Sequence, residues 1–163
     1  MTNYLDAIVL GIHITGAAVW VGGVVALGIV ALGLRGPPLD DPVKYSEAVS
    51  RVARRLAFVM WPALLVTIAT GFYNLSWYLP EGAAGLSTPQ GTVLLAKVSL
   101  VGFVILVAGL HTFYVGPQVR RRIASGWNPD RLRPLRRLNG ILGGLALVGS
   151  VAVLFLAALL AWV

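Results

Sequence analysis

Two histidines are the residues of this sequence best suited to chemistry. His13 and His111 are the only histidines among 163 residues, and both fall within long apolar stretches. Placing an ionisable side chain in hydrocarbon is costly, so an intramembrane histidine is a functional candidate by default. An imidazole in an apolar helical bundle is a common ligand of haem iron. The alternative is a histidine that only hydrogen-bonds to a neighbouring helix.

The neighbours of the two histidines favour a flat cofactor. Small residues stand beside His13, at Gly11 and Gly16, and would let a macrocycle approach the helix. Trp20 follows His13 at a spacing that puts both on one helix face. Tyr114 follows His111 by one turn. We therefore predict that His13 and His111 ligate haem iron, with Trp20 and Tyr114 beside the cofactor.

The expected depths of the two histidines argue against a single shared haem. With helix centres near Trp20 and Val104, His13 lies about 10 Å to the outer side and His111 about 10 Å to the inner side. A vertical gap of roughly 20 Å is too large for two ligands of one iron. Either the histidines serve different haems, or only one is a ligand, or the helix centres are misplaced.

Lys97 is the only basic residue outside two basic clusters. Its expected depth matches that of His13, so it either snorkels to the outer head groups or provides a cation for haem propionates or a carboxylate substrate. On the inner side, Met60 falls at the depth of His111 and is either a sixth iron ligand or a core residue. Arg54 and Arg55 lie just below and could hold inner propionates.

Other kinds of site find little support. The chain has no cysteine, which removes disulfides and thiolate chemistry. A zinc or non-haem iron site needs three or four ligands, and no acidic residue is expected at mid-membrane. A hydrolase triad, a Walker loop and a dinucleotide-binding fingerprint are absent. A transporter would show broken helices at the midplane, and only Pro62 hints at one.

Four apolar stretches must position these residues. They lie at about 5–34, 52–79, 90–117 and 138–162, and each exceeds the roughly 20 residues that a membrane-spanning helix needs. The composition agrees, with 58% hydrophobic and only 12% charged residues. The stretches lack the alternating polarity of membrane strands. We predict an all-α integral membrane four-helix bundle, with residues 1–163 forming one transmembrane domain.

The basic residues predict the orientation of this bundle. They gather in the two loops that follow the first and third stretches, at Arg35, Lys44, Arg51, Arg54, Arg55, Arg120, Arg121, Arg122, Arg131, Arg133, Arg136 and Arg137. The positive-inside rule places both loops in the cytoplasm and both termini outside, in a cell (inner or plasma) membrane. These clusters also attract anionic lipid head groups, and we expect no nucleic-acid partner.

Local signals refine the elements. Asp41-Pro42 and Thr88-Pro89 are N-cap and first-turn pairs. The segment of about 42–54 is amphipathic and is expected to lie at the membrane interface before it joins the second helix. Pro62 predicts a kink. Gly140 and Gly144 form a GxxxG pair, which favours either close helix packing or a homodimer seam.

Several motifs together resemble the HemJ and CopD-like membrane proteins. In chain order they are His13 with Trp20 and Gly22-Gly23, Arg54-Arg55 before Pro62 and Gly71, Lys97 before His111 and Tyr114, and Arg136-Arg137-Leu138-Asn139. The third of these resembles the third helix of HemJ-type protoporphyrinogen oxidases. The resemblance covers nearly the whole chain in order and spacing.

The resemblance implies a four-helix protein that binds haem b, one or two per chain, through histidine. Its HemJ branch implies a membrane oxidoreductase that oxidises protoporphyrinogen IX and passes electrons onward, with Lys97 as the functional (catalytic) lysine. Two departures from the HemJ pattern are Gly140, where an acid is usual, and the different loop of 35–50. The CopD branch implies copper resistance, for which two methionines and two histidines offer few soft ligands.

Three functions remain open at this point. The first is a b-haem redox protein exchanging electrons with a quinone pool or acting on a porphyrin. The second is a copper or small-solute transport component of the CopD type. The third is a membrane adaptor without chemistry, in which both histidines would tolerate alanine.

Overall fold

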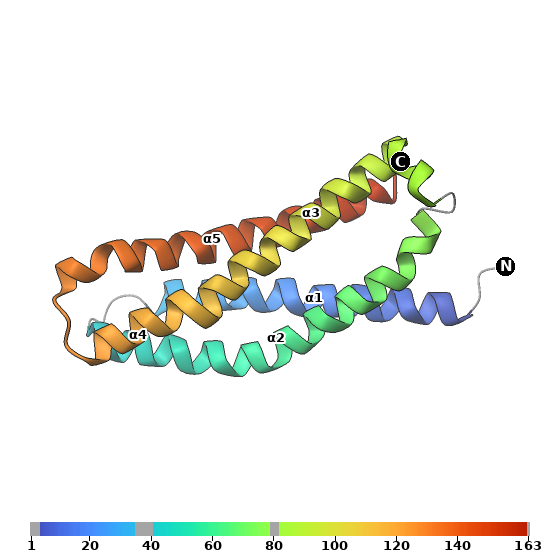
Figure 1. Ribbon diagram of the computed structural model, residues 1–163. Helices are drawn as coiled ribbons and strands as arrows, with labels where there is room; N and C mark the ends of the chain where they lie inside the picture. Colours follow the sequence, from blue (N-terminus) through green and yellow to red (C-terminus); the bar gives the residue numbers. More distant parts are fainter. Residues whose placement is uncertain (1–3, 35–40, 79–81, 163) are drawn as a thin grey trace.

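The computed structural model describes residues 4–34, 41–78 and 82–162, and these ranges contain helices and no strand. The helices, labelled in Figure 1, are α1 (Tyr4–Gly33), α2 (Pro42–Tyr78), the 3-10 helix η1 (Gly82–Ser87), α3 (Pro89–Gly109), the π-helix η2 (Leu110–Val115), α4 (Gly116–Ala124) and α5 (Pro129–Leu160). Helices α3, η2 and α4 follow one another as one rod. Four helical rods in the described ranges are long and apolar enough to cross a membrane. The predicted all-α membrane bundle is confirmed.

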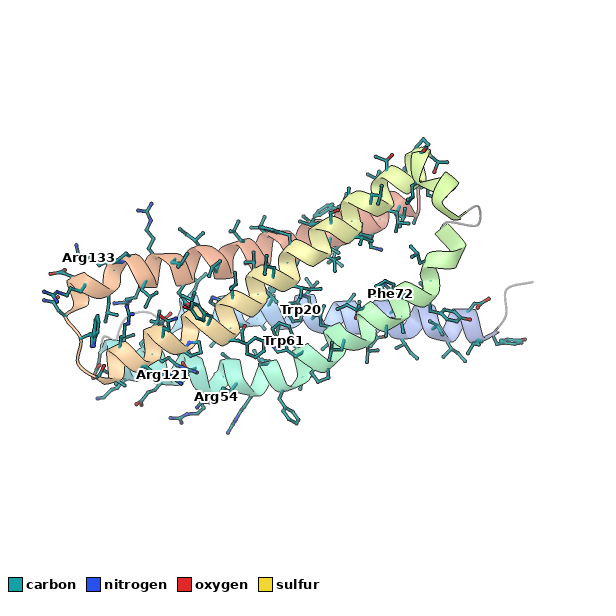
Figure 2. All side chains as sticks on the ribbon, in the orientation of Figure 1. Trp20, Arg54, Trp61, Phe72, Arg121 and Arg133 are labelled. Atoms are coloured by element: carbon teal, nitrogen blue, oxygen red, sulfur yellow. The ribbon has the colours of Figure 1, made fainter. Side chains whose placement is uncertain are left out.

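The bundle consists of two helix pairs. Helix α1 packs along α2, and α3 packs along α5, while α1 meets α5 and α2 meets α3 and α4 between the pairs. Figure 1 shows the start of α1 and the end of α5 at the same end of the molecule. The labelled arginines Arg54, Arg121 and Arg133 gather toward the opposite end (Figure 2). This polarity agrees with the predicted topology; Arg35 lies outside the described residues.

Glycines allow the helices of each pair to approach closely. A Cβ on Gly16 of α1 would collide with Thr67 Oγ1 and lie 3.0 Å from the Ala63 carbonyl oxygen, both on α2. A Cβ on Gly149 of α5 would lie 2.6 Å from Val104 Cγ2 on α3. At both positions the neighbouring helix comes so close to the glycine backbone that a side chain would collide with it.

The predicted Gly140/Gly144 pair is not one of these close approaches. No atom lies within 4 Å of a Cβ built on either glycine. The face of α5 that meets α3 carries Gly143 and Gly149 instead, so the prediction of close packing within the chain is wrong. A homodimer seam at Gly140 and Gly144 stays a prediction.

The helix starts follow the predicted caps. Asp41 Oδ1 accepts the Val43 amide at 2.7 Å, and Thr88 Oγ1 accepts the Gly91 amide at 3.0 Å. A third cap that the sequence analysis missed lies at Asn128, whose Oδ1 accepts the Asp130 amide at 2.8 Å before α5. These three side chains therefore fix where α2, α3 and α5 begin.

The helices outrun the predicted apolar stretches. Helix α2 begins at Pro42 rather than near 52, and α5 begins at Pro129 rather than near 138. Arginine is a good helix former, so the basic segments continue the helices beyond the apolar core. The segment of about 42–54 is the first part of α2, and its place at the membrane interface stays a prediction.

Helix α2 bends near its middle, as Figure 1 shows. The labelled Trp61 lies at this bend (Figure 2), next to Pro62 inside the helix. Proline removes a backbone hydrogen bond and pushes against the preceding turn, so the predicted kink is confirmed.

Candidate functional site

His13 is held by α2 in an orientation suited to a metal ligand. Its Nδ1 lies 2.9 Å from the Thr67 carbonyl oxygen and 3.1 Å from Thr70 Oγ1. A carbonyl only accepts hydrogen bonds, so Nδ1 carries the proton and donates it. The neutral imidazole then keeps its lone pair on Nε2. Metal-ligating histidines commonly donate their other N–H to a backbone carbonyl in this way.

The local sequence of α2 builds this seat. Thr67 and Thr70 donate their hydroxyl protons to the carbonyls of Ala63 and Val66, at 2.8 and 2.7 Å. Gly71 leaves the space in which the ring lies, because a Cβ there would be 3.1 Å from His13 Cε1. The threonines and the glycine together hold the imidazole against α2.

Asn74 extends the same face of α2 by one turn. Its side chain is only 4% exposed, and its Oδ1 has no hydrogen-bond partner among the described residues. A buried amide oxygen without a partner is unusual in a folded protein. Asn74 therefore adds an unsatisfied acceptor to the α2 face that carries Thr67, Thr70 and Gly71.

Lys97 on α3 lies close enough to His13 for its charge to act on the imidazole. The lysine is half-buried and forms no ion pair with any residue in the described ranges. The depth that the sequence predicts for Lys97, level with His13, stays a prediction. An unpaired cation here repels a metal ion and attracts an anionic group.

Trp20 lies in the core, farther along α1 than His13. Its Nε1 donates to Ser150 Oγ on α5 at 3.2 Å, and its ring meets Trp61 edge-on with centroids 5.4 Å apart. Figure 2 labels both tryptophans in the middle of the bundle. The structure thus gives Trp20 a packing and hydrogen-bonding role that joins α1, α2 and α5.

His111 is held differently, inside the α3 and α5 pair. It lies in the π-helix η2, and its Cε1 is 3.4 Å from a Cβ built on Gly143. Its Nδ1 is buried and, like Asn139 Oδ1, makes no hydrogen bond of ordinary geometry among the described residues, although the backbone of Asn139 lies near the ring. π-Helical turns are rare and are frequent at functional sites. No pattern in the sequence indicated this turn.

The contacts between helices set the distance between the two histidines. Trp20 is level with Ser150 through their hydrogen bond, and His111 is level with Gly143. His13 to Trp20 and Ser150 to Gly143 are each seven residues, about 10 Å of helix, in the same direction. The imidazoles are therefore about 20 Å apart along the bundle, as the sequence predicted, and cannot ligate one iron.

The remaining predicted site residues are not gathered around His111. Met60 is buried in the core, where its side chain fills the space beside Gly23. Tyr114 is 64% exposed, and Arg54 and Arg55 are exposed. Tyr114 shares no face with His111 because the wider π-helical turn breaks the spacing of an α-helix.

The donor set around His13 is open. No group of three or more His, Cys, Asp or Glu side chains gathers in the described part of the chain. Asp6 lies seven residues before His13 on the same face of α1, and Tyr73 donates to its Oδ1 at 3.0 Å. The sequence analysis missed Asp6, Thr67, Thr70 and Asn74, although their helical spacing was a usable signal.

Comparison with known proteins shows the family of this chain. The model of the family described as copper resistance protein D (CopD) matches residues 50–160. This chain belongs to the CopD family. With four apolar helices, it is a multi-pass membrane protein. Neither the curated proteins nor the solved structures give a match.

The CopD match begins inside α2 and continues to the end of α5, and α1 lies before it in the chain. Lys97, His111 and the α2 seat of Thr67, Thr70 and Gly71 lie within it, and His13 lies outside it. The match supports the CopD side of the resemblance, and the HemJ-type assignment stays an expectation. The argument for His13 therefore rests on its own contacts.

Proposed function

We propose that this CopD-family protein is a membrane component of copper handling and that His13 receives the copper ion through Nε2. The observation that carries the proposal is the hydrogen bond from His13 Nδ1 to the Thr67 carbonyl, which leaves Nε2 unprotonated. Imidazole nitrogen is a good ligand for copper. Copper is here the cargo of the protein and not a resident cofactor.

The surrounding residues would make the site a transient one. Few protein ligands surround His13, so water and oxygen groups would complete the coordination of the ion. The nearby Lys97 cation weakens the binding of any positive ion. A site on a transport path must bind its ion strongly enough for the ion to enter and weakly enough for the ion to leave. The scarcity of soft ligands in the sequence is compatible with this requirement.

A copper tolerance assay tests the proposal. A host strain that lacks its own copper-resistance genes is grown over a copper series with the wild-type chain, His13→Ala or His111→Ala, and cellular copper is measured. We expect His13→Ala to behave as the empty vector and His111→Ala to behave as wild type, at equal expression. Wild-type behaviour of His13→Ala would refute the proposal.

A second candidate function is the b-haem redox protein that the sequence first suggested. The unpaired, half-buried Lys97 beside His13 favours it, because this cation could pair with a haem propionate. The seat of His13 fits an axial ligand, whereas Gly143 lies directly against the ring of His111. Haem at His13 would supply one-electron chemistry, and oxidation of a porphyrin with Lys97 as the catalytic lysine is the narrower form of this candidate.

The two candidates differ in spectrum and in the effect of Lys97. A reduced-minus-oxidised spectrum of protein expressed with ample haem shows a Soret band only for the haem protein. Lys97→Gln is expected to loosen haem but to tighten copper. A membrane adaptor gives neither signal, and both histidines then tolerate alanine.

The proposal also includes the orientation of the chain in the membrane. Both basic loops face the cytoplasm of a cell membrane, and α1 begins on the outer side. Copper would then approach His13 from outside. Reporter fusions after Leu34 and at the end of α5 test this orientation.

A further inference from the structure

A cavity of about 280 Å³ lies at the arginine-rich end of the bundle, between α2 and α4. One face of α2 and one face of α4 line it: Val43, Ser46, Glu47, Ser50, Arg51, Arg54, Arg120, Ile123 and Ala124. The α2 residues recur at helical spacing and form a single stripe. Helix α4 adds Arg120 from the second basic cluster. The cavity thus brings the two basic clusters together.

The three arginines of this cavity are not neutralised by the protein. Arg51, Arg54 and Arg120 form no ion pair with a carboxylate in the described ranges, although Glu47 also lines the cavity. Three like charges around one hollow repel one another, and Glu47 offsets only one of them. An anion in the cavity would relieve this repulsion. The cavity therefore has the electrostatics of an anion site.

We propose that the cavity between α2 and α4 binds a phosphate group. Guanidinium groups match phosphate through paired hydrogen bonds, and the hydroxyls of Ser46 and Ser50 are further donors. The volume of about 280 Å³ lies just below that of ligand pockets, roughly 300–1,000 Å³, which suits a head group rather than a large cofactor. The bound phosphate would bridge α2 of one helix pair to α4 of the other.

Two sources could supply this phosphate. The first is the head group of an anionic phospholipid, since the cavity lies where the apolar rods give way to basic helix, and Val43, Ile123 and Ala124 add an apolar margin. The second is a soluble phosphate compound on the same side of the membrane. The chemistry at the arginines is the same for both sources.

The test uses the full chain in detergent with three probes: dioctanoyl phosphatidic acid, dioctanoyl phosphatidylcholine and inorganic phosphate. Binding is measured by native mass spectrometry and by the shift in unfolding temperature. We expect phosphatidic acid to bind at least about tenfold more tightly than phosphatidylcholine. The double variant R54Q/R120Q should lose this preference.

A matched control isolates the cavity from bulk charge. R55Q/R121Q removes the same charge from the neighbouring positions, which do not line the cavity. We expect its binding to stay within about twofold of wild type. If R54Q/R120Q folds poorly, R54K/R120K and S50A test the site instead. The first removes the paired guanidinium donors and the second removes a hydroxyl donor, and neither removes charge.

The outcomes decide both the site and the source. Binding of phosphatidic acid that depends on Arg54 and Arg120 and resists inorganic phosphate assigns the cavity to lipid. Stabilisation by inorganic phosphate with the same dependence assigns it to soluble phosphate. Equal losses in the cavity and control variants, or no binding of either probe, would overturn the proposal. A failure here leaves the copper proposal untouched.

Discussion

The two histidines of this protein occupy opposite situations in one bundle. His13 lies on α1, donates Nδ1–H to α2 and keeps a lone pair on Nε2 beside the charge of Lys97. His111 lies in a π-helical turn of the other helix pair, against Gly143 and near the Asn139 backbone, and its buried Nδ1 makes no hydrogen bond of ordinary geometry among the described residues. Residue type did not distinguish them, and their predicted depths, about 10 Å to either side of the helix centres, did not reveal these different contacts.

The difference shows that the hydrogen bond made by Nδ1 decides whether Nε2 of an intramembrane imidazole can bind a metal ion. At His13 the Thr67 carbonyl settles the tautomer, so Nε2 can accept a metal ion. At His111 Nδ1 makes no hydrogen bond of ordinary geometry, although the backbone of Asn139 lies near the ring, and the ring packs against Gly143. The following predictions test this contrast.

The largest expected effect comes from the helix contact beside the His13 seat. In Gly16→Ala the new methyl group meets Thr67 Oγ1 and the Ala63 carbonyl, so α1 must move away from α2. We expect a loss of about 1–3 kcal/mol in stability, together with loss of copper binding. Unfolding in mixed micelles measures the loss in stability. Gly22→Ala, which meets no atom within 4 Å, is the control and should be at least as stable as wild type.

The next effect concerns the charge beside His13. Removing the cation in Lys97→Gln should tighten copper binding about 5- to 30-fold, which corresponds to a repulsion of roughly 1–2 kcal/mol between the lysine and the bound ion. Competition with a chromophoric copper chelator measures it. Lys97→Arg keeps the charge and should stay near wild type. Weaker copper binding in Lys97→Gln would contradict the proposed transient site.

A smaller effect is expected from the glycine under the ring. A methyl group on Gly71 comes within 3.1 Å of His13 Cε1, so Gly71→Ala should displace the imidazole by a few tenths of an ångström. We expect roughly tenfold weaker copper binding, in the range seen for outer-shell changes. Gly143→Ala makes the equivalent change under His111 and should leave copper binding unchanged. Equal effects of Gly71→Ala and Gly143→Ala on copper binding would contradict the proposed difference between His13 and His111.

The smallest effect belongs to Thr70. Thr70→Val removes the second acceptor near Nδ1 but leaves the Thr67 carbonyl in place. We expect copper affinity to fall by about two- to threefold, which corresponds to roughly 0.5 kcal/mol, the low end of the contribution of a neutral hydrogen bond. A loss as large as that of His13→Ala would assign the orienting role to the Thr70 hydroxyl.

Much of the scaffold was predictable from the sequence because hydropathy and proline leave strong local signals. The four apolar rods, the caps at Asp41 and Thr88 and the bend at Pro62 follow from single residues or short stretches. The depth gap between His13 and His111 follows from the constant helical rise. The basic residues between about 117 and 138 were placed in a loop, because hydropathy reports the membrane core and not the helix end.

The partners across helices were not predictable, because they depend on rotation about each helix axis. Gly140 and Gly144 matched a packing motif, yet Gly143 faces α3. Thr67 meets His13 through a backbone carbonyl, which every residue has. The π-helical turn at His111 shifts the faces that follow it, so Tyr114 does not accompany His111.

Counting copper on the purified protein tests the central claim most directly. Wild type, His13→Ala and His111→Ala are loaded with copper in detergent, passed through a desalting column and assayed for metal per chain. We predict about one copper per chain for wild type and His111→Ala, and none for His13→Ala. Full copper occupancy in His13→Ala, or its loss only in His111→Ala, would contradict the account.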